Sequence, residues 1–306
     1  MKVLIIGLGS VALKHIQVIK EIDNSSQFFA LRHDKNSTID EGITPIYTWD
    51  AIPSDINFII ISNPTHLHAQ TILKATELNK PLFIEKPPVS NLVEWDEVQN
   101  ILKNHNQITY CGFLLRFHPA LEWLKANINK KDVLEFSAYC GSYLPDWRTD
   151  KDYTQSYSAK KNQGGGVHLD LIHEIDYIQW IFGAPISSNG YVKQISNLNI
   201  DSFDTAHYYL EYENTVGSIS LNYYRRNPKR TLNMVLKNGE LTVDLLKNSI
   251  TDKNGKLMYS SKINAFELLK RQMNYFIDCV QNNQKCMNSF EDTYDCMQTC
   301  LNIKEL

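Results

Sequence analysis

The sequence has no long apolar segment, and none of its runs approaches the roughly 18 residues expected of a membrane-spanning helix. It also has no charge excess, because 31 Lys and Arg stand against 34 Asp and Glu, a net charge of −3. That balance does not favour nucleic acid or an anionic membrane as a partner. The stretch MKVLIIGLGS turns to glycine too early for a secretory signal. We therefore expect a soluble, cytoplasmic protein with neither nucleic-acid nor membrane partners.

The six cysteines include no CxxC pair, and the sequence contains no evident repeat and no low-complexity segment. Cys296 and Cys300 fall on one face of an expected helix, where buried thiols are more usual than a metal site or a disulfide. We predict no metal. At 306 residues the chain is long enough for roughly two domains.

An apolar run at residues 2–6 passes directly into the motif GLGSVA at residues 7–12, with a helix expected over 13–22. Strand, glycine turn and helix in this order are typical of dinucleotide binding. Gly7 permits the tight turn, Gly9 lets backbone amides approach a pyrophosphate, and Ala12 allows the helix to pack closely. The helix N-terminus favours the anion. Gly7, Gly9, Ser10, Val11 and Ala12 are therefore predicted cofactor contacts.

A second strand, expected over 27–31, ends in Arg32-His33-Asp34. An acidic residue at this place binds the ribose 2′-hydroxyl of NAD, whereas an arginine meets the 2′-phosphate of NADP or stacks on adenine. Arg32 favours NADP slightly, and Asp34 turned inwards would favour NAD. We predict NAD or NADP as the cofactor, with Arg32 and His33 among its contacts.

A third apolar run, at 57–62, ends in Asn63-Pro64-Thr65 before a helix expected over 69–78. Backbone and the Thr65 hydroxyl at this sheet edge are placed to line the cofactor. His66 and His68 are candidate ligands or proton carriers. Because no third ligand is near, histidines that cap the helix or contact the cofactor are favoured over a metal site.

Lys86 stands in the stretch FIEKPP at residues 83–88, between Glu85 and two prolines. The prolines stiffen the backbone, so Lys86 is delivered at the C-terminal edge of a short apolar strand, where open α/β sheets bind ligands. The alternative is a surface lysine before a proline turn. A helix from an N-cap at Ser90 to residue 105 and a strand over 108–113 complete the pattern of a doubly wound parallel sheet.

From residue 133 onward strand-like alternation dominates, at 135–140, 205–212, 216–224 and 231–236, with hairpin signals at Asn238-Gly239 and Asn254-Gly255. This predicts an antiparallel or mixed sheet. Helices are expected over 265–280 and after Ser289, where Asp292 completes a capping-box spacing. We place the boundary between the two domains at 118/119.

Between these strands, three glycines at 164–166 lead into a helix on which Asp170 and His173, at i and i+3, share a face. They are a candidate acid/base pair or ordinary first-turn residues. The loop Tyr143-Leu144-Pro145-Asp146-Trp147-Arg148, followed by Tyr153 and Tyr157, suits stacking on a sugar or base and clamping a phosphate. A hydrophobic loop packed on the sheet explains its aromatic residues nearly as well. The basic cluster Arg225, Arg226, Lys229 and Arg230 reads as solvated charge, with a phosphate contact as the alternative.

In order and spacing these motifs resemble the Gfo/Idh/MocA oxidoreductases, the relatives of glucose-fructose oxidoreductase and inositol dehydrogenase. The resemblance covers essentially the whole chain. Its motifs are Gly7-Leu8-Gly9, Asn63-Pro64-Thr65 with His68, Glu85-Lys86-Pro87, Gly112-Phe113 to Arg116 and Pro119, and the glycine run with Asp170 and His173.

The resemblance implies an α/β protein with an N-terminal Rossmann domain at 1–118, a doubly wound parallel sheet that binds NAD(P). It implies a C-terminal α/β domain at 119–306 with a large open, mostly antiparallel sheet, which binds substrate and forms dimers or tetramers. The implied reaction is NAD(P)-dependent oxidation of a sugar, polyol or nucleotide-sugar hydroxyl. The alternatives are a cofactor-sensing regulator that is not a catalyst, and a reductase of a non-carbohydrate substrate.

Within that family the lysine, aspartate and histidine of these motifs touch the substrate. His173 is then the candidate base, Lys86 stabilises the developing alkoxide, and Asp170 orients the substrate. The aspartate and histidine stand one residue closer than in many relatives, so Glu174 is the alternative base. The other predicted contacts are Glu85 for the cofactor and, for the substrate, Arg116, Tyr143, Trp147, Arg148 and Tyr157.

Overall fold

The computed structural model describes residues 1–32, 34 and 41–306, and the chain divides into two compact units. The first unit comprises residues 1–113 and 265–294, and the second comprises 114–264 and 295–306. The chain passes from the first unit to the second at 113/114, close to the predicted boundary at 118/119. Residues 265–294 differ from the prediction, because they return to the first unit.

The first unit is built on a six-stranded parallel sheet in the order β3-β2-β1-β4-β5-β6. Its strands are β1 (Lys2–Ile6), β2 (Gln27–Leu31), β3 (Ile43–Ile46), β4 (Phe58–Ile61), β5 (Leu82–Ile84) and β6 (Thr109–Cys111). The order reverses between β1 and β4, and doubly wound sheets bind ligands at this reversal. The predicted doubly wound parallel sheet is confirmed.

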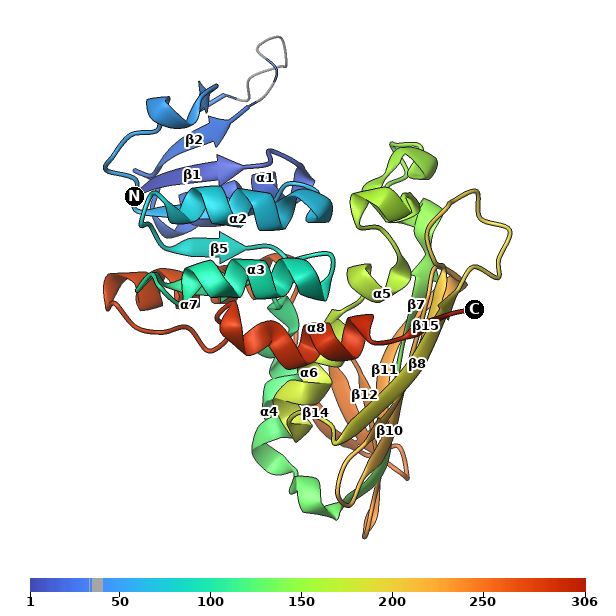
Figure 1. Ribbon diagram of the computed structural model, residues 1–306. Helices are drawn as coiled ribbons and strands as arrows, with labels where there is room; N and C mark the ends of the chain where they lie inside the picture. Colours follow the sequence, from blue (N-terminus) through green and yellow to red (C-terminus); the bar gives the residue numbers. More distant parts are fainter. Residues whose placement is uncertain (33, 35–40) are drawn as a thin grey trace. The chain divides into compact units, whose positions relative to one another are not determined.

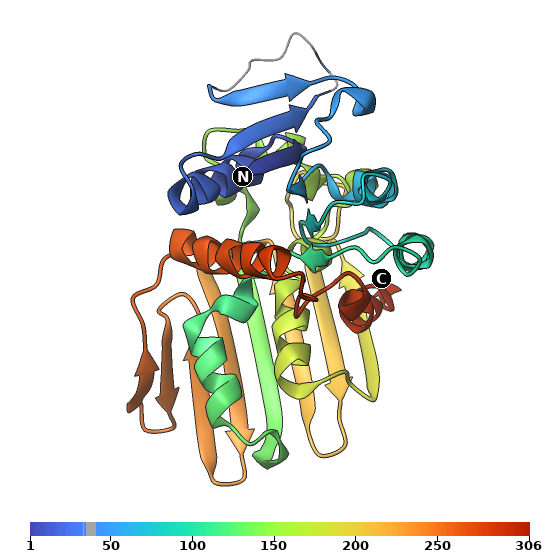
Figure 2. The ribbon, with the colours of Figure 1, turned by 90° about the vertical axis from the view of Figure 1, so that its left-hand side faces the viewer.

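Helices cover both faces of this sheet, which is why β1 and β4 are nearly continuous apolar runs. α1 (Ser10–Ile22) and α7 (Ala265–Gln281) lie on one face, and α2 (His68–Thr76) and α3 (Leu92–Leu102) on the other (Figures 1 and 2). Phe276 of α7 packs against Phe58, Phe83 and Tyr110 of three strands, at ring distances of 5.3–5.9 Å. This aromatic packing explains why α7 belongs to the first unit.

Two local features of this unit differ from the expectations. β3 has no counterpart among the expected strands; it contains Pro45 and forms the edge of the sheet, where a missing N–H is tolerated. The N-cap of α3 is Asn91, whose side chain accepts a hydrogen bond from the Glu94 backbone at 2.9 Å. The expected cap, Ser90, lies one residue earlier and donates to the Glu94 carboxylate instead.

The second unit is built on a nine-stranded sheet in the order β14-β13-β12-β11-β7-β10-β9-β8-β15. Only the β10–β7 and β15–β8 pairs are parallel. The strands are β7 (Val133–Tyr143), β8 (Ser187–Lys193), β9 (Thr205–Glu211), β10 (Val216–Asn222), β11 (Tyr224–Leu236), β12 (Gly239–Asp244), β13 (Ser249–Asp252), β14 (Leu257–Ser260) and β15 (Lys304–Glu305). The prediction of a large, mostly antiparallel sheet is confirmed.

The helices of the second unit lie on one side of its sheet (Figure 1). They are α4 (Pro119–Asn127), α5 (Val167–Asp170), α6 (His173–Phe182) and α8 (Tyr294–Leu301). Phe136 of β7 stacks on Phe182 of α6 at 4.9 Å. No helix of the described chain covers the opposite face, which exposes large residues such as Tyr209 and Val216.

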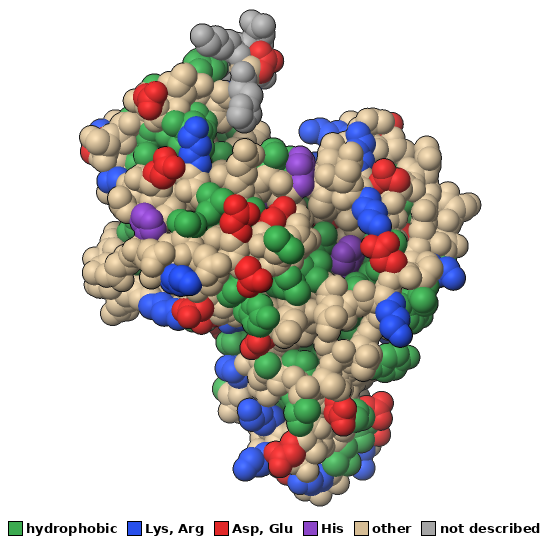
Figure 3. Space-filling model, viewed as in Figure 1, with side chains coloured by type: hydrophobic (Ala, Val, Ile, Leu, Met, Phe, Trp, Pro, Cys, Tyr) green, Lys and Arg blue, Asp and Glu red, His purple; other side chains and the backbone are tan. Residues whose placement is uncertain are grey.

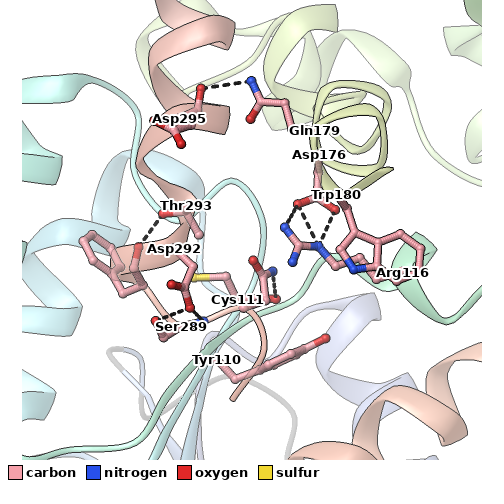
Figure 4. Close-up of polar contacts among 12 residues, drawn as sticks. Tyr110, Cys111, Arg116, Asp176, Gln179, Trp180, Ser289, Asp292, Thr293 and Asp295 are labelled. Atoms are coloured by element: carbon pink, nitrogen blue, oxygen red, sulfur yellow. Dashed lines mark hydrogen bonds and ion pairs between the residues drawn. The ribbon is translucent and has the colours of Figure 1, made fainter. Parts of the chain in front are cut away.

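All six cysteines are buried and free, as expected for Cys296 and Cys300. Ser289 donates to Asp292 from its backbone N–H and its hydroxyl, at 3.0 and 2.6 Å, as the capping-box spacing predicts (Figure 4). Among the helices that the structure describes, none combines the length and the apolar character needed to cross a membrane.

Candidate functional site

In the first unit, the turn after β1 lies against the turn after β4, at the reversal of strand order. Gly7 has a φ of +95°, and a Cβ there would lie 2.2 Å from the backbone nitrogen of Asn63. The Ser62 hydroxyl donates to the Gly7 carbonyl at 2.9 Å. Only glycine permits both this φ and this approach. A Cβ on Gly9, in contrast, would meet nothing within 4 Å, so the space beside the turn is open.

The N-terminus of α1 is suited to an anion. Gly9 caps the helix without a side-chain hydrogen bond, no acid stands in the first turn, and Ser10 and Val11 are exposed. Ala12 is fully buried, which lets the helix pack closely. Free N–H groups at a helix start, together with the helix dipole, attract negative charge. The predicted residues 7–12 therefore fit the pyrophosphate of a dinucleotide.

The residues predicted to distinguish NAD from NADP follow β2. Arg32 is half-buried, and its backbone N–H donates to the Ile46 carbonyl at 2.8 Å. His33, a predicted contact, lies outside the described residues. The preference for either cofactor stays a prediction.

His68 begins α2 and is almost fully buried. It therefore packs against the turns that follow β4 and β5 and does not face an open site. Its Nδ1 lies 2.8 Å from the Pro87 carbonyl oxygen and its Nε2 lies 2.8 Å from the Asn63 carbonyl oxygen. Burial lowers the pKa of His68, although both carbonyls oppose this. His68 thus ties together the two predicted turns, at Asn63-Pro64-Thr65 and at Glu85-Lys86-Pro87.

Glu85 follows β5 and is held from α1 by His15, whose Nε2 lies 2.6 Å from Glu85 Oε1. Burial raises the pKa of Glu85, but the hydrogen bond and charge of His15 and the charge of Lys86 outweigh it, so that the pKa is lowered. The Lys86 backbone N–H also donates to Glu85 Oε2, at 3.3 Å. An ionised Glu85 therefore anchors the backbone that carries the half-buried Lys86.

In the second unit, Asp170 is buried at the end of α5 and bound by two tyrosines. Tyr157 donates to its Oδ1 at 2.7 Å and Tyr223 to its Oδ2 at 2.5 Å. Burial and the charge of Asp170 raise the pKa of both phenols, so both keep their protons. A Cβ on Gly165 would lie 2.1 Å from the Tyr157 carbonyl oxygen, so the glycine run lets the tyrosine loop approach this helix.

The single helix expected for Asp170 and His173 is wrong. α5 ends at Asp170, Leu171 leaves helical geometry with φ −101° and ψ 24°, and α6 begins at His173. The i, i+3 spacing therefore no longer argues that the two side chains share a face, because the helix is interrupted between them. His173 is half-buried at the first position of α6. Its role as base stays a prediction.

Glu174, the alternative base, has no exposed surface and forms an ion pair with Arg230. The Arg230 Nε donates to its Oε1 at 2.8 Å, and Nη2 donates to the same oxygen. Burial lowers the pKa of Arg230, but the charge of Glu174, its hydrogen bond and the neighbouring Cys140 and Tyr177 together raise it by more. A buried carboxylate committed to an arginine is poorly placed to take a proton from a ligand, so this geometry disfavours Glu174 as base.

Arg116, a predicted substrate contact, forms a second buried pair with Asp176 of α6 (Figure 4). Its Nε lies 3.1 Å from both carboxylate oxygens and its Nη2 lies 2.6 Å from Oδ1. Burial raises the pKa of Asp176, and Arg116 only partly opposes this. The guanidinium thus holds the short helix η3 (Leu114–Phe117) against α6. Its contact with substrate stays a prediction.

The predicted aromatic loop approaches the Asp170 cluster through Trp147. Trp147, in the short helix η5 (Leu144–Trp147), meets the Tyr223 ring edge-on at 5.3 Å and donates to Ser142 at 2.8 Å. Trp147 and Arg148 are exposed and Tyr143 is half-buried. The structure therefore brings Trp147 and Tyr157 together around Asp170, through Tyr223.

Three features of the site have no counterpart in the sequence predictions. They are the contact of His15 with Glu85, the contact of Tyr223 with Asp170, and the buried ion pair of Arg230 with Glu174. His15 and Tyr223 stand 70 and 53 residues from the carboxylates they bind, so no local pattern connects them. Arg230 did carry a signal. Because strand side chains alternate, Arg230 shares the inner face of β11 with Leu232 and Met234, which marks it as an inward charge.

A parallel sheet with a glycine turn at its reversal point, in a chain that also holds a second α/β unit, is typical of a dinucleotide-binding protein. Residues 1–113 match the model of an oxidoreductase family with an NAD-binding Rossmann fold, and residues 132–242 match the GFO/IDH/MocA C-terminal domain. Together the matches cover more than half of the chain. The chain belongs to the Gfo/Idh/MocA oxidoreductase family, as the motifs indicate.

Curated relatives match parts of the chain. A 2,7-anhydro-N-acetylneuraminate hydratase from Mediterraneibacter gnavus is 25% identical over 183 residues, which is 58% of this chain and 48% of that protein. A scyllo-inositol 2-dehydrogenase (NAD(+)) from Bacillus subtilis is 28% identical over 167 residues, 52% of this chain and 46% of that protein. The chain thus spans about half the length of these relatives.

Solved structures share the whole fold. A UDP-N-acetylglucosamine 3-dehydrogenase from Acidithiobacillus ferrooxidans superimposes with a TM-score of 0.79, over 99% of this chain and 96% of that one. The two chains are 17% identical. At this identity the likeness shows the fold alone.

Proposed function

We propose that the protein is an NAD(P)-dependent oxidoreductase that transfers a hydride between nicotinamide and a hydroxyl-bearing carbon of a sugar, polyol or nucleotide sugar. The observation that carries the proposal is the glycine turn at the sheet reversal, with open space at Gly9 and an uncapped helix start. The inositol dehydrogenase among the relatives supports the class of substrate. We assign cofactor binding to residues 1–118 and substrate binding to 119–306.

The cofactor, when bound, supplies the hydride chemistry. The chain supplies binding, proton transfer and charge stabilisation. Lys86, carried by the anchored Glu85 turn, donates a hydrogen bond to the oxygen on which negative charge develops. His173 accepts the hydroxyl proton. Asp170 orients the substrate, and its two tyrosines fix the position of its carboxylate.

We propose further that the uncovered face of the nine-stranded sheet joins copies of the chain into a dimer or tetramer. Tyr209 and Val216 on this face are 64% and 55% exposed, although a sheet face with large side chains is usually covered. Light scattering coupled to size-exclusion chromatography tests this. Tyr209→Lys should shift the mass towards the monomer, and a monomeric wild type would contradict the assignment.

The experiment that tests the function follows cofactor reduction with polyols, nucleotide sugars and other sugars, and cofactor oxidation with ketones. Wild type is compared with Lys86→Ala and with Lys103→Ala, an exposed lysine of the same unit. We expect Lys86→Ala to lower kcat by about 10²–10³-fold, the usual loss for one charge-stabilising donor, and Lys103→Ala to behave as wild type.

Substrate loss and product formation are followed by mass spectrometry in the same samples, because one relative is a hydratase. A protein that binds the cofactor tightly and converts no member of the panel would be a cofactor-sensing regulator. Turnover of a ketone with no turnover of any carbohydrate would favour the reductase alternative.

A further inference from the structure

Two histidines hold the turn that carries Lys86, one from each face of the six-stranded sheet. His15 belongs to α1, and its Nε2 lies 2.6 Å from the Oε1 atom of Glu85. His68 belongs to α2, and its Nδ1 lies 2.8 Å from the carbonyl oxygen of Pro87. Both neighbours of Lys86 in the sequence are therefore attached to a helix.

The polar contact of His15 is directed at Glu85 alone. The side chain of His15 has no exposed surface, and its ring meets the Phe83 ring of β5 edge-on at 4.9 Å. Glu85 is ionised, as its lowered pKa indicates, so its carboxylate only accepts and the imidazole Nε2 donates. The Nδ1 atom is buried without a hydrogen-bond partner among the residues that the structure describes. Within that part of the chain, Glu85 is the one hydrogen-bond partner of the ring.

The His15–Glu85 contact differs from the charged groups at the surface. On the face shown in Figure 3, acidic and basic side chains are interspersed in solvent, where a single ion pair contributes little. The side chains of His15 and Glu85 are only 0% and 16% exposed. A short hydrogen bond to a carboxylate that water screens poorly is strong and has a defined geometry. Such a contact is suited to holding a neighbouring group in place.

The helix that carries His15 begins at the glycine turn. Gly9 is the N-cap of α1, and its carbonyl accepts the first helical hydrogen bond, from the Leu13 N–H at 3.1 Å. His15 follows six residues later, about 9 Å along the helix axis. The positions of the glycine turn and of Glu85 therefore depend on one continuous helix.

Glu85 passes this placement on to the lysine. Its own backbone N–H donates to the Ile61 carbonyl of β4 at 2.9 Å, and its Oε2 accepts from the Lys86 backbone N–H at 3.3 Å. Pro87 and Pro88, which follow, are buried and each fixes its own φ. A backbone restrained on both sides sets the direction in which the Lys86 side chain leaves the turn.

We propose that His15 is a positioning residue of the reaction, which holds Glu85 and thereby keeps Lys86 at a fixed place relative to the glycine turn. A displacement of about 1 Å at a reacting group can lower a rate by about 10²-fold, even when its cause is remote. The catalytic part of this inference rests on the proposed function. The placement of Lys86 is measured separately, without turnover.

The kinetic test compares His15→Leu, which removes the donor, with His15→Gln, whose amide nitrogen can still donate to Glu85. The probe is the sugar or polyol that wild type converts fastest. We expect His15→Leu to lower kcat by about 10–100-fold with little change in the KM for the cofactor, and His15→Gln to recover most of the loss. Should the leucine variant not fold, His15→Met replaces it, because methionine adapts to irregular packing.

A double variant decides whether His15 acts through Lys86. In Lys86→Ala, the further change His15→Leu should leave kcat as it is, since two residues that act as one unit are not additive. A merely structural histidine would reduce the amount of folded protein and leave kcat per folded molecule unchanged. The matched control is Ile19→Val, because Ile19 is fully buried in α1 one turn beyond His15. It should keep the kcat of wild type.

The placement of Lys86 is followed by its rate of acetylation with trace acetic anhydride, measured by peptide mass spectrometry on the full chain. Lys103, an exposed lysine of the same unit, is the internal standard. His15→Leu should raise the ratio of the Lys86 rate to the Lys103 rate severalfold, because the turn is released on one side. His15→Gln and Ile19→Val should keep the ratio of wild type. Melting curves confirm that each variant is folded.

The two proposals fail separately. Turnover by wild type, with the kcat and the acetylation ratio unchanged in His15→Leu, would overturn the positioning role and leave the oxidoreductase standing. A further fall in kcat when His15→Leu is added to Lys86→Ala would also overturn it, because His15 would then act elsewhere. A raised acetylation ratio in His15→Leu, without conversion of any substrate by wild type, would retain the placement of Lys86 by His15 and refute the proposed function.

Discussion

Arg230→Met should destabilise the second unit, because it leaves the Glu174 carboxylate buried without its counter-charge. Glu174 has no exposed surface, and its Oε1 accepts hydrogen bonds from both Nε and Nη2 of Arg230. Breaking a buried pair by removing one partner costs about 3–5 kcal/mol. The Arg230 side chain is 21% exposed, which admits some water and favours the lower end of that range.

A loss of about 3 kcal/mol in the free energy of unfolding corresponds to a fall in Tm of about 6–12 °C for a unit of this size. Urea unfolding, with calorimetric Tm, measures the loss. The double variant Glu174→Leu/Arg230→Met should recover most of the stability, since apolar replacements of a buried pair are often neutral.

Lys237→Met is the matched control, because Lys237 and Asp132 form an exposed pair at 3.5 Å, and such pairs contribute about 0–1 kcal/mol. A loss below about 1 kcal/mol in Arg230→Met would refute the reasoning. The double variant also tests the alternative base, because a kcat close to wild type would exclude Glu174 from proton transfer.

Three further predictions concern single positions. Gly7→Ala should lower the affinity for the cofactor and cost at least about 2 kcal/mol of stability, because of the left-handed φ and the clash with the backbone at that position. Gly9→Ala should bind the cofactor much as wild type does. Fluorescence titration with NADH measures both affinities. Burial lowers the pKa of His168 to about 4, so it stabilises the fold fully above its unfolded pKa of 6.5 and loses up to about 3 kcal/mol as the pH falls towards 4. His168→Gln should flatten that pH dependence in urea titrations, and an unchanged slope would count against it. Tyr223→Phe removes one donor to the buried Asp170 and should cost about 1–3 kcal/mol and lower kcat, with kinetics and melting as the checks.

Local patterns determined the cofactor half of this protein. An apolar run, a glycine turn and an amphipathic helix follow one another within the first 22 residues, and each is recognisable because its cause lies within a few residues. The same holds for the strand that delivers Lys86 and for the hairpins of the second sheet. The motifs in order were enough to indicate the family, which the two matching family models confirm.

Tertiary structure decided which partner each buried carboxylate binds and where the helices end. Asp170, Glu174 and Asp176 look alike in sequence, yet one binds two tyrosines and the others bind arginines brought from η3 and β11. α7 belongs to the first unit because its Phe276 completes an aromatic core built by strands far away in sequence. Charge pairing and packing depend on distance in space, and distance in space between remote residues is set by the whole fold and not by local periodicity.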